Sequence, residues 1–440
     1  MFHVSRLLFN VSLALIFCCF SAAAQDTLRV PRAPQPDRPL HSADTTITTS
    51  GLGPDTLDLG LSAPSQRETL TQRLSEILQS KGAQRMQTAL LVYDLTADTV
   101  MFAYMPDALM RPASCQKLVT SIGALYALGG NYNLRTTFLA RPAVADSGKV
   151  LRGNVYVRAG FDPLLGLSEV RSFVNELKAL GVDTLRGDLV IDLSMKDDSH
   201  WGAGWCWDDG NDTNPDLSPL QYKDQGTFEN AFAAEMKRAG IFWQGGIRRD
   251  AIPSDAVKLA EATHSIDQLL LRMMKQSDNR YAEALFYQIA ARSGKKHAGA
   301  VEARKQLEPL VRTCGLDPAD YVAADGSGLS PYNFLSARLL VALLRYAWRD
   351  SALYAHLLPT LPVAGTDGTL PSRMKRGSAA GNVRAKTGTV TGVSTLAGYA
   401  DAPTGNRIAF AILMNGNQTA AKGRALQDEI CHAFTSLRNP

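Results

Sequence analysis

The sequence has few cysteines, little net charge and no long apolar run beyond its first residues. Its 440 residues contain 46 Lys and Arg against 42 Asp and Glu, a net charge of +4. So small a basic excess, with no basic stripe interleaved with aromatic residues, argues against nucleic acid as a partner. After Phe20 no segment is long and apolar enough to span a bilayer, so we expect no stable membrane span. Four of the six cysteines lie after that point, define no disulfide framework and are expected to be small buried apolar residues: Cys115, Cys206, Cys314 and Cys431.

Two kinds of catalytic motif are also absent. The chain has no His-Glu-x-x-His and no Cys-x-x-Cys pair, which are zinc signatures, so we expect no metal and no cofactor. Its seven histidines offer no clear catalytic triad, and there is no Gly-x-Ser-x-Gly nucleophile elbow. A serine nucleophile in this chain would therefore need a base other than histidine.

The first 65 residues differ in composition from the rest. Arg6 precedes an apolar run over 7–20, which is followed by Ser-Ala-Ala-Ala-Gln at 21–25. This pattern is typical of a secretory signal, so we expect a signal peptide at 1–24 and export to the periplasm. Residues 25–65 contain six prolines and no aromatic residue, a composition that predicts a disordered tether.

Strand-like runs lie at both ends of the remaining chain. TALLVYDL and TVMFAY (88–104) form one group, and VRAKTGTV, STLAGYAD and RIAFAILMN form the other, ending at 415. Strands at both ends with helices between them predict an α/β (α+β) fold, in which one antiparallel sheet is flanked by helices. We place this catalytic domain at 66–150 and 229–440. Residues 151–228 alternate strand-like runs with turns and are expected to form an inserted β-rich module.

The pattern Ser-x-x-Lys occurs three times. The copies are Ser114–Lys117, Ser293–Lys296 and Ser372–Lys375. The first copy opens a segment whose apolar residues recur at helical spacing until Gly129, so its serine and lysine should share one face of a helix. The pattern alone does not decide which copy carries chemistry.

Two further motifs, each present once, select the first copy. They are Ser277-Asp278-Asn279 and Lys386-Thr387-Gly388-Thr389. Taken singly, the former could be a helix cap and the latter a solvated strand edge. The order Ser-x-x-Lys, Ser-x-Asn, Lys-Thr-Gly is the signature of penicillin-recognising enzymes. Because Ser293 and Ser372 follow the Ser-x-Asn motif, the order leaves Ser114 as the nucleophile.

On these motifs and their flanks the chain resembles the class C low-molecular-mass penicillin-binding proteins, the exported D-alanyl-D-alanine carboxypeptidase/endopeptidase family. The resemblance covers about 88–440 and includes AGFDPLL, GWCWDD, ADGSGLSPYN and LPVAGTDGTL. It implies the β-lactamase-like fold of the penicillin-recognising serine transferases. Family members commonly carry two modules between the first two motifs, whereas the 159 residues between Lys117 and Ser277 leave room for one.

The resemblance implies a serine-type D-alanyl-D-alanine carboxypeptidase, a DD-endopeptidase, or both. The substrates would be peptidoglycan stem peptides ending in D-Ala-D-Ala, and β-lactams would be inhibitors. Ser114 would form the acyl-enzyme, with Lys117 as its general base. Burial and the nearby charge of Lys386 would lower the pKa of Lys117. Ser277 would relay a proton to the leaving amine, and Asn279 would hold a substrate amide.

The Lys-Thr-Gly strand would bind the substrate. Lys386, Thr387 and Thr389 would meet its terminal carboxylate, and the missing side chain of Gly388 would let the peptide lie against the strand. By analogy with the family, the backbone N–H groups of Ser114 and Thr389 would form the oxyanion hole.

Several alternatives stay open at this point. A β-lactamase carries the same three motifs, although the long insert and the lack of a Glu-x-x-Leu-Asn block argue against the class A kind. A catalytically weak peptidoglycan-binding protein is a third possibility, but it would have no need of both motif lysines. Asp325 and Asp367 could line the cleft or cap turns. The tryptophans of 201–207 could grip glycan or fill the core of the module.

Overall fold

The computed structural model describes residues 66–141, 149–206 and 214–436. The signal peptide expected at 1–24 and the tether expected at 25–65 lie outside these residues.

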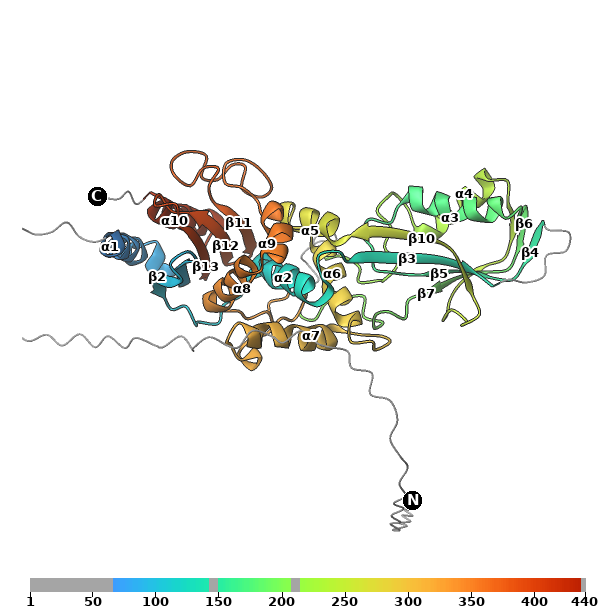
Figure 1. Ribbon diagram of the computed structural model, residues 1–440, viewed down its shortest axis with the longest axis horizontal. Helices are drawn as coiled ribbons and strands as arrows, with labels where there is room; N and C mark the ends of the chain where they lie inside the picture. Colours follow the sequence, from blue (N-terminus) through green and yellow to red (C-terminus); the bar gives the residue numbers. More distant parts are fainter. Residues whose placement is uncertain (1–65, 142–148, 207–213, 437–440) are drawn as a thin grey trace, which may run out of the picture. The chain divides into compact units, whose positions relative to one another are not determined.

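A five-stranded antiparallel sheet joins the two ends of the described chain. Its order is β11 (Arg384–Val390), β12 (Val393–Asp401), β13 (Arg407–Asn415), β1 (Gln87–Asp94) and β2 (Thr99–Tyr104). In Figure 1 the blue strand β2 therefore belongs to the same sheet as the red strands β11, β12 and β13. The predicted antiparallel sheet built from both ends of the chain is confirmed.

Helices cover both faces of this sheet, because its strands bury alternate side chains on each face. Leu91 and Tyr93 of β1 pack into a core formed with helices on one face: α2 (Gln116–Leu128), α5 (Ile266–Lys275), α6 (Asn279–Ala291), α7 (Ala300–Thr313), α8 (Ala337–Arg349) and α9 (Ser351–Leu357). Leu90 and Val92 pack on the other face against α1 (Gln66–Gln79) and α10 (Ala420–Thr435). Short 3-10 helices complete the elements: η1 (Ala83–Arg85), η2 (Ala113–Cys115), η4 (Pro318–Asp320) and η5 (Leu358–Thr360).

The inserted module is larger than its expected bounds of 151–228. Its five-stranded sheet has the order β10 (Val257–Ser265), β3 (Asn133–Ala140), β5 (Val155–Arg158), β7 (Leu189–Asp192) and β9 (Ile247–Arg249). A parallel sheet of three short strands adds β4 (Val150–Arg152), β6 (Thr184–Arg186) and β8 (Phe242–Gln244).

Two helices, α3 (Leu167–Ala179) and α4 (Phe228–Arg238), pack on the larger module sheet, where Phe138 contacts Phe173 and Phe232. The module therefore begins with β3 and ends with β10. Sequence composition missed both limits because only the short turn at 129–132 separates α2 from β3, and β10 leads into α5 with no linker.

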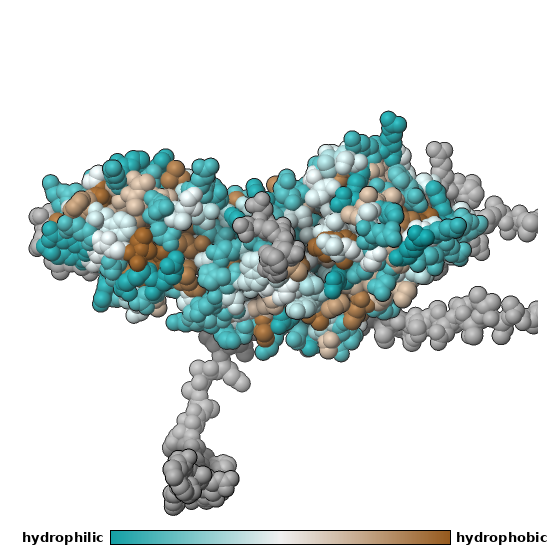
Figure 2. All heavy atoms as spheres, turned by 180° about the vertical axis from the view of Figure 1, so that it is seen from behind, coloured by the Kyte–Doolittle hydropathy of each residue, from teal (hydrophilic) through white to brown (hydrophobic). Residues whose placement is uncertain are grey.

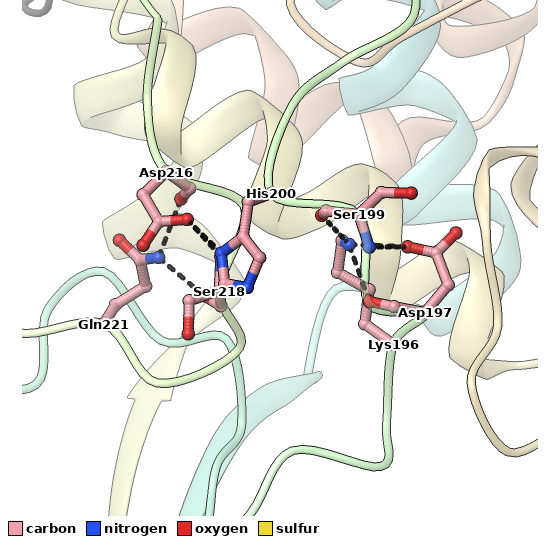
Figure 3. A network of polar contacts seen from close by, with 7 residues as sticks. All are labelled: Lys196, Asp197, Ser199, His200, Asp216, Ser218 and Gln221. Atoms are coloured by element: carbon pink, nitrogen blue, oxygen red, sulfur yellow. Dashed lines mark hydrogen bonds and ion pairs between the residues drawn. The ribbon is translucent and has the colours of Figure 1, made fainter.

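The segment that follows β7 carries a network of polar contacts (Figure 3). The amine of Lys196 is fully buried, donates to Asp197 Oδ1 at 2.6 Å and lies 4.6 Å from the centre of the Tyr287 ring on α6. Further along the segment, a nitrogen of His200 lies 2.8 Å from a carboxylate oxygen of Asp216. The buried Lys196 amine of the module thus makes a cation–π contact with Tyr287 on α6 of the catalytic domain.

On the face shown in Figure 2, hydrophilic residues predominate and hydrophobic ones form small separate patches. None of the helices in the described part of the chain is long and apolar enough to cross a membrane. Among the same residues, no group of three or more His, Cys, Asp or Glu is arranged to hold a metal ion.

Candidate active site

The nucleophile candidate lies in a tight turn before a buried helix. Ser114 is in η2, and Ala113 before it has a φ of 44°, in the left-handed region that non-glycine residues rarely adopt. Lys117 follows in the first turn of α2 and is fully buried. Its Nζ lies 3.0 Å from Ser114 Oγ, so the two side chains meet as their spacing predicts.

Two further oxygens surround the Lys117 amine. Nζ lies 2.7 Å from Asn279 Oδ1, at the first residue of α6, and 2.8 Å from the backbone oxygen of Ser327. Both atoms are carbonyl oxygens and can only accept hydrogen bonds. Ser114 Oγ is therefore the one partner of the three that can donate a proton to the amine.

Burial is the main cause of a lowered pKa at Lys117. Loss of solvent lowers the pKa of its amine to about 8, while the charges of Asp325, Glu283 and Asp278 act in the opposite direction. The expected lowering by Lys386 is not among the main causes of this shift. The repulsion between the two amines acts instead on Lys386. Burial first, and then the charge of Lys117, lower the pKa of Lys386 to about 7.

The second and third motifs meet through their own hydrogen bond. Lys386 lies on β11, is fully buried, and donates from Nζ to Ser277 Oγ at 2.9 Å and to the backbone oxygen of Thr387 at 2.6 Å. Ser277 has a φ of 59°, a strained conformation for a serine just before α6. This contact aligns a proton donor behind the Ser277 hydroxyl.

The rest of the Lys-Thr-Gly-Thr strand faces the same site. Thr387 Oγ1 donates to Thr369 Oγ1 at 2.7 Å, and a guanidinium nitrogen of Arg424 on α10 lies 3.4 Å from Thr389 Oγ1. Thr389 is exposed. The hydroxyl of the exposed Thr389 is therefore open to a ligand near the exposed Arg424 guanidinium. Thr387 is half-buried, and the Lys386 amine is fully buried.

Packing against the nucleophile turn requires the absence of a side chain at Gly388. A Cβ added there would lie 2.1 Å from Thr395 Oγ1, 2.8 Å from the backbone oxygen of Pro112 and 2.9 Å from the backbone nitrogen of Ser114. Thr395 also donates to that Pro112 oxygen at 2.7 Å. The missing side chain thus lets β11 and β12 pack against the nucleophile turn.

The competing residues lie elsewhere or point away. Ser293, Lys296, Ser372 and Lys375 of the other two Ser-x-x-Lys copies are exposed. Cys115 is fully buried, its thiol donates to the backbone oxygen of Lys386, and burial raises its pKa. Of the four cysteines, all free, only Cys115 and Cys431 are fully buried; Cys314 is half-buried and Cys206 is exposed, contrary to expectation.

Asp325 and Asp367 cap turns. Asp325 is buried and accepts from the Gly328 and Ser330 backbone N–H groups at 2.7 and 2.6 Å and from the Trp205 indole at 2.9 Å. Asp367 accepts from the Val363 N–H and from the Lys275 amine. Of the tryptophans expected to form a cluster, Trp205 is buried, Trp201 is 47% exposed and Trp207 lies outside the described residues.

Sequence reasoning missed four contributors to this site. They are the Ser327 backbone oxygen, the Thr369 hydroxyl, the Arg424 guanidinium and the Glu283 carboxyl, which is described further below. The ADGSGLS and GTDGTL stretches contain Ser327 and Thr369, but the sequence prediction named only the aspartates of these stretches.

A cavity of about 560 Å³ adjoins the Ser277–Asn279 motif. Arg272 and Arg280 of the catalytic domain line this cavity, and so do Leu164 and Lys223 of the module. The module therefore contributes directly to the space beside the motif residues.

All three motifs meet at one edge of an antiparallel sheet flanked by helices, which places the chain in the class of penicillin-recognising serine enzymes. Comparison with known proteins gives the family within this class. The profile of the D-Ala-D-Ala carboxypeptidase 3 (S13) family matches residues 70–222 and 221–436. The chain belongs to this family, so the predicted fold and the predicted serine-type D-alanyl-D-alanine carboxypeptidase family are confirmed.

Individual relatives agree with this assignment. The chain is 26% identical over 432 residues to the D-alanyl-D-alanine carboxypeptidase DacB of Haemophilus influenzae, covering 80% of this chain and 88% of that protein. The crystal structure of penicillin-binding protein 4 from the same organism superposes with a TM-score of 0.73 at 23% identity, over 82% of this chain and 97% of that one. A second structure of it, complexed with a novel β-lactam, gives a TM-score of 0.67 at 24% identity over 81% and 98%. A predatory peptidoglycan endopeptidase from Bdellovibrio bacteriovorus gives 0.55 at 17% identity over 81% and 94%.

Proposed function

We propose that the chain removes the terminal D-alanine from peptidoglycan stem peptides ending in D-Ala-D-Ala, through an acyl-enzyme on Ser114. The observation that carries this proposal is the set of contacts of the Lys117 amine. A neutral amine has two N–H donors and one lone pair. Asn279 Oδ1 and the Ser327 oxygen engage the two donors, so the lone pair faces the Ser114 hydroxyl.

Acylation then follows from this geometry. Ser114 Oγ forms a bond to the carbonyl carbon of the penultimate D-alanine as its proton passes to Lys117 Nζ. The backbone N–H groups of Ser114 and Thr389 stabilise the developing oxyanion. When the C–N bond breaks, Ser277 gives its proton to the leaving amine and receives one from Lys386, whose Nζ is 2.9 Å away. Water later hydrolyses the acyl-enzyme and releases the shortened peptide.

Recognition of the substrate carboxylate falls to the outer part of the Lys-Thr-Gly strand. Thr387 and Thr389 offer hydroxyls, and Arg424 supplies an exposed positive charge 3.4 Å from Thr389 Oγ1. Lys386 supports them from behind, since its amine is fully buried. Asn279, with one amide oxygen on Lys117, is placed to hold the substrate amide through its NH₂ group.

Export to the periplasm fits this substrate, because peptidoglycan lies outside the cytoplasmic membrane. The support is the signal-like composition of residues 1–24. β-Lactams are the expected inhibitors, since they mimic D-Ala-D-Ala, and the Haemophilus relative has been crystallised with one.

Mass spectrometry of peptidoglycan fragments incubated with the purified protein tests the proposal. Loss of one terminal D-alanine from monomeric peptides supports carboxypeptidase action, and cleavage of cross-linked dimers supports endopeptidase action as well. Rapid release of hydrolysed penicillin without either product would support the β-lactamase alternative. Intact peptides together with an unlabelled Ser114 after exposure to fluorescent penicillin would support a binding protein and refute the proposal.

A further inference from the structure

Two buried carboxyl groups hold the loop that carries Ser327. Glu283 lies one turn beyond Asn279 on α6, is 1% exposed, and accepts from the Ser327 backbone N–H at 2.8 Å and the Gly326 N–H at 3.2 Å. Asp325, 2% exposed, closes the other side of the loop by accepting from the Gly328 N–H at 2.7 Å. The loop therefore has its backbone donors fixed from both sides.

The same loop is wedged between α6 and the nucleophile turn. A Cβ on Gly326 would lie 2.5 Å from Phe286 Cβ, and one on Gly328 would lie 1.8 Å from the backbone oxygen of Ala113. The oxygen of Gly326 also accepts from Thr120 Oγ1 on α2 at 2.6 Å. A shift of this loop would therefore require a shift of α2 or α6, the two helices that meet at the site.

The Ser327 oxygen is the point where this loop touches the chemistry. It lies 2.8 Å from Lys117 Nζ, and the N–H of the same residue is bound by Glu283. Asn279, which contacts the amine from the other side, stands four residues before Glu283 on α6 and so on the same helix face. Helix α6 thus fixes the positions of both carbonyl oxygens that contact the Lys117 amine, one directly through Asn279 and one through Glu283.

We propose that Glu283 is a positioning residue: it fixes the Ser327 peptide so that the Ser327 oxygen and Asn279 Oδ1 direct the Lys117 lone pair at Ser114. This inference rests on the proposed role of Lys117 as the base. It adds a residue outside the three motifs that acts on the reaction without touching the substrate.

The role of Glu283 has a measurable signature, which is slower acylation with unchanged reversible binding. The charged and titratable groups near Lys117 come from four parts of the chain: Asp278 and Glu283 at α6, Asp325 in the loop, Cys115 in η2 and Lys386 on β11. Burial first, and then the charge of Asp325, raise the pKa of Glu283 to about 8, so its carboxyl group is mostly uncharged below that pH. Near neutral pH Glu283 therefore acts through its two hydrogen bonds to the loop more than through charge.

Two substitutions test the hydrogen bonds of Glu283 to the loop. Glu283→Gln keeps the length of the side chain, but its amide can accept from only one of the two loop N–H groups. Glu283→Asp keeps both carboxyl oxygens but shortens the side chain by one methylene, so its carboxyl group no longer reaches both. Glu235→Gln is the matched control, because it removes another buried carboxylate, paired with Arg171 and Arg238 in the module.

The measurement is the second-order rate of acylation by fluorescent penicillin as a function of pH, on the full exported chain. For both Glu283→Gln and Glu283→Asp we expect a maximal rate lower by about tenfold, with the rising limb near its wild-type position. Glu235→Gln should keep the wild-type rate and limb. Reversible penicillin binding, measured in a Ser114→Ala background, should be unchanged within about twofold by either Glu283 substitution, because Glu283 does not touch the ligand.

Two results would overturn the inference. They are a wild-type rate in both Glu283 variants, and weaker reversible binding that accounts for the whole loss and so leaves only a structural role. If Glu283→Gln does not fold, as judged by its thermal unfolding, the Glu283→Asp rate and binding decide. Failure of the proposed function is recognised separately, since the wild-type protein would then leave D-Ala-D-Ala peptides intact whether or not Ser114 is labelled.

Discussion

The lysine beside the nucleophile should govern the pH dependence of acylation. Burial lowers the pKa of Lys117 from 10.5 to about 8. At pH 7 about one amine in ten is then neutral, compared with about one in three thousand for an unperturbed lysine. Complete burial therefore increases the available base by about 300-fold at neutral pH. We expect the acylation rate to rise about tenfold per pH unit below pH 7 and to fall above pH 8, where Lys386, with a pKa of about 7, no longer carries the proton that it gives to Ser277.

Lys117→Arg tests the same reasoning by keeping the charge and removing the base. A guanidinium stays protonated at any pH that the protein tolerates, so it cannot take the Ser114 proton. Loss of a general base should slow acylation by roughly 10²- to 10⁴-fold. The assay is the second-order rate of labelling by fluorescent penicillin, followed by digestion and mapping of the adduct. Lys375→Arg is the control, because Lys375 is the exposed lysine of another Ser-x-x-Lys copy.

Two outcomes would refute this account. One is a Lys117→Arg enzyme that acylates within about tenfold of the wild-type rate. The other is a wild-type rate that does not change between roughly pH 6 and pH 9, because a base with a pKa of about 8 must titrate there. In either case the Ser114 proton would have to pass to another group.

Three further predictions concern the surroundings of the nucleophile. Cys115→Ala should keep most of the penicillin labelling, since this thiol is buried under β11 and turned away from the site; a label that maps to Cys115 in the wild type would contradict this. Gly388→Ala should reduce the labelling rate by about 100-fold or more, because the added Cβ would lie 2.9 Å from the Ser114 nitrogen; near-normal labelling would show that the turn can yield. Arg424→Ala should slow carboxylate-bearing substrates by about tenfold relative to their esters, and an equal loss for both would exclude carboxylate recognition by Arg424.

The arrangement of the site explains why the order of the motifs in the sequence favours Ser114 over the other two candidate serines. Ser114, Ser277 and Lys386 lie far apart in the chain, but the first two begin neighbouring helices and the third lies on a strand that packs against η2. Side chains that carry chemistry leave a signature in sequence, and so does the alternation that buries both faces of β1. The pairing of strands from the two ends of the chain follows from the same pattern.

Other features were decided by the tertiary structure alone. The Ser327 contact is made by a backbone oxygen, which any residue type would supply, so no sequence pattern marks it. In the sequence, Glu283 is one polar residue among others in a helical segment. Its contact with the Ser327 loop is evident only from the tertiary structure. The limits of the module were hidden because a turn of only four residues separates α2 from β3, and β10 runs directly into α5.

The sequence by itself determined which residues are candidates for the chemistry: Ser114, its neighbour Lys117 and the lysine of the third motif. Only the fold lowers the pKa of the Lys117 amine toward neutral pH. A lysine three residues after a serine is ordinarily solvated and protonated, and the same pattern at Ser372–Lys375 is exposed. The pKa of Lys117 falls because helices and a loop from distant parts of the chain exclude water from its amine. That exclusion is a property of packing, since it depends on what lies around the residue in space and not on its neighbours in the chain.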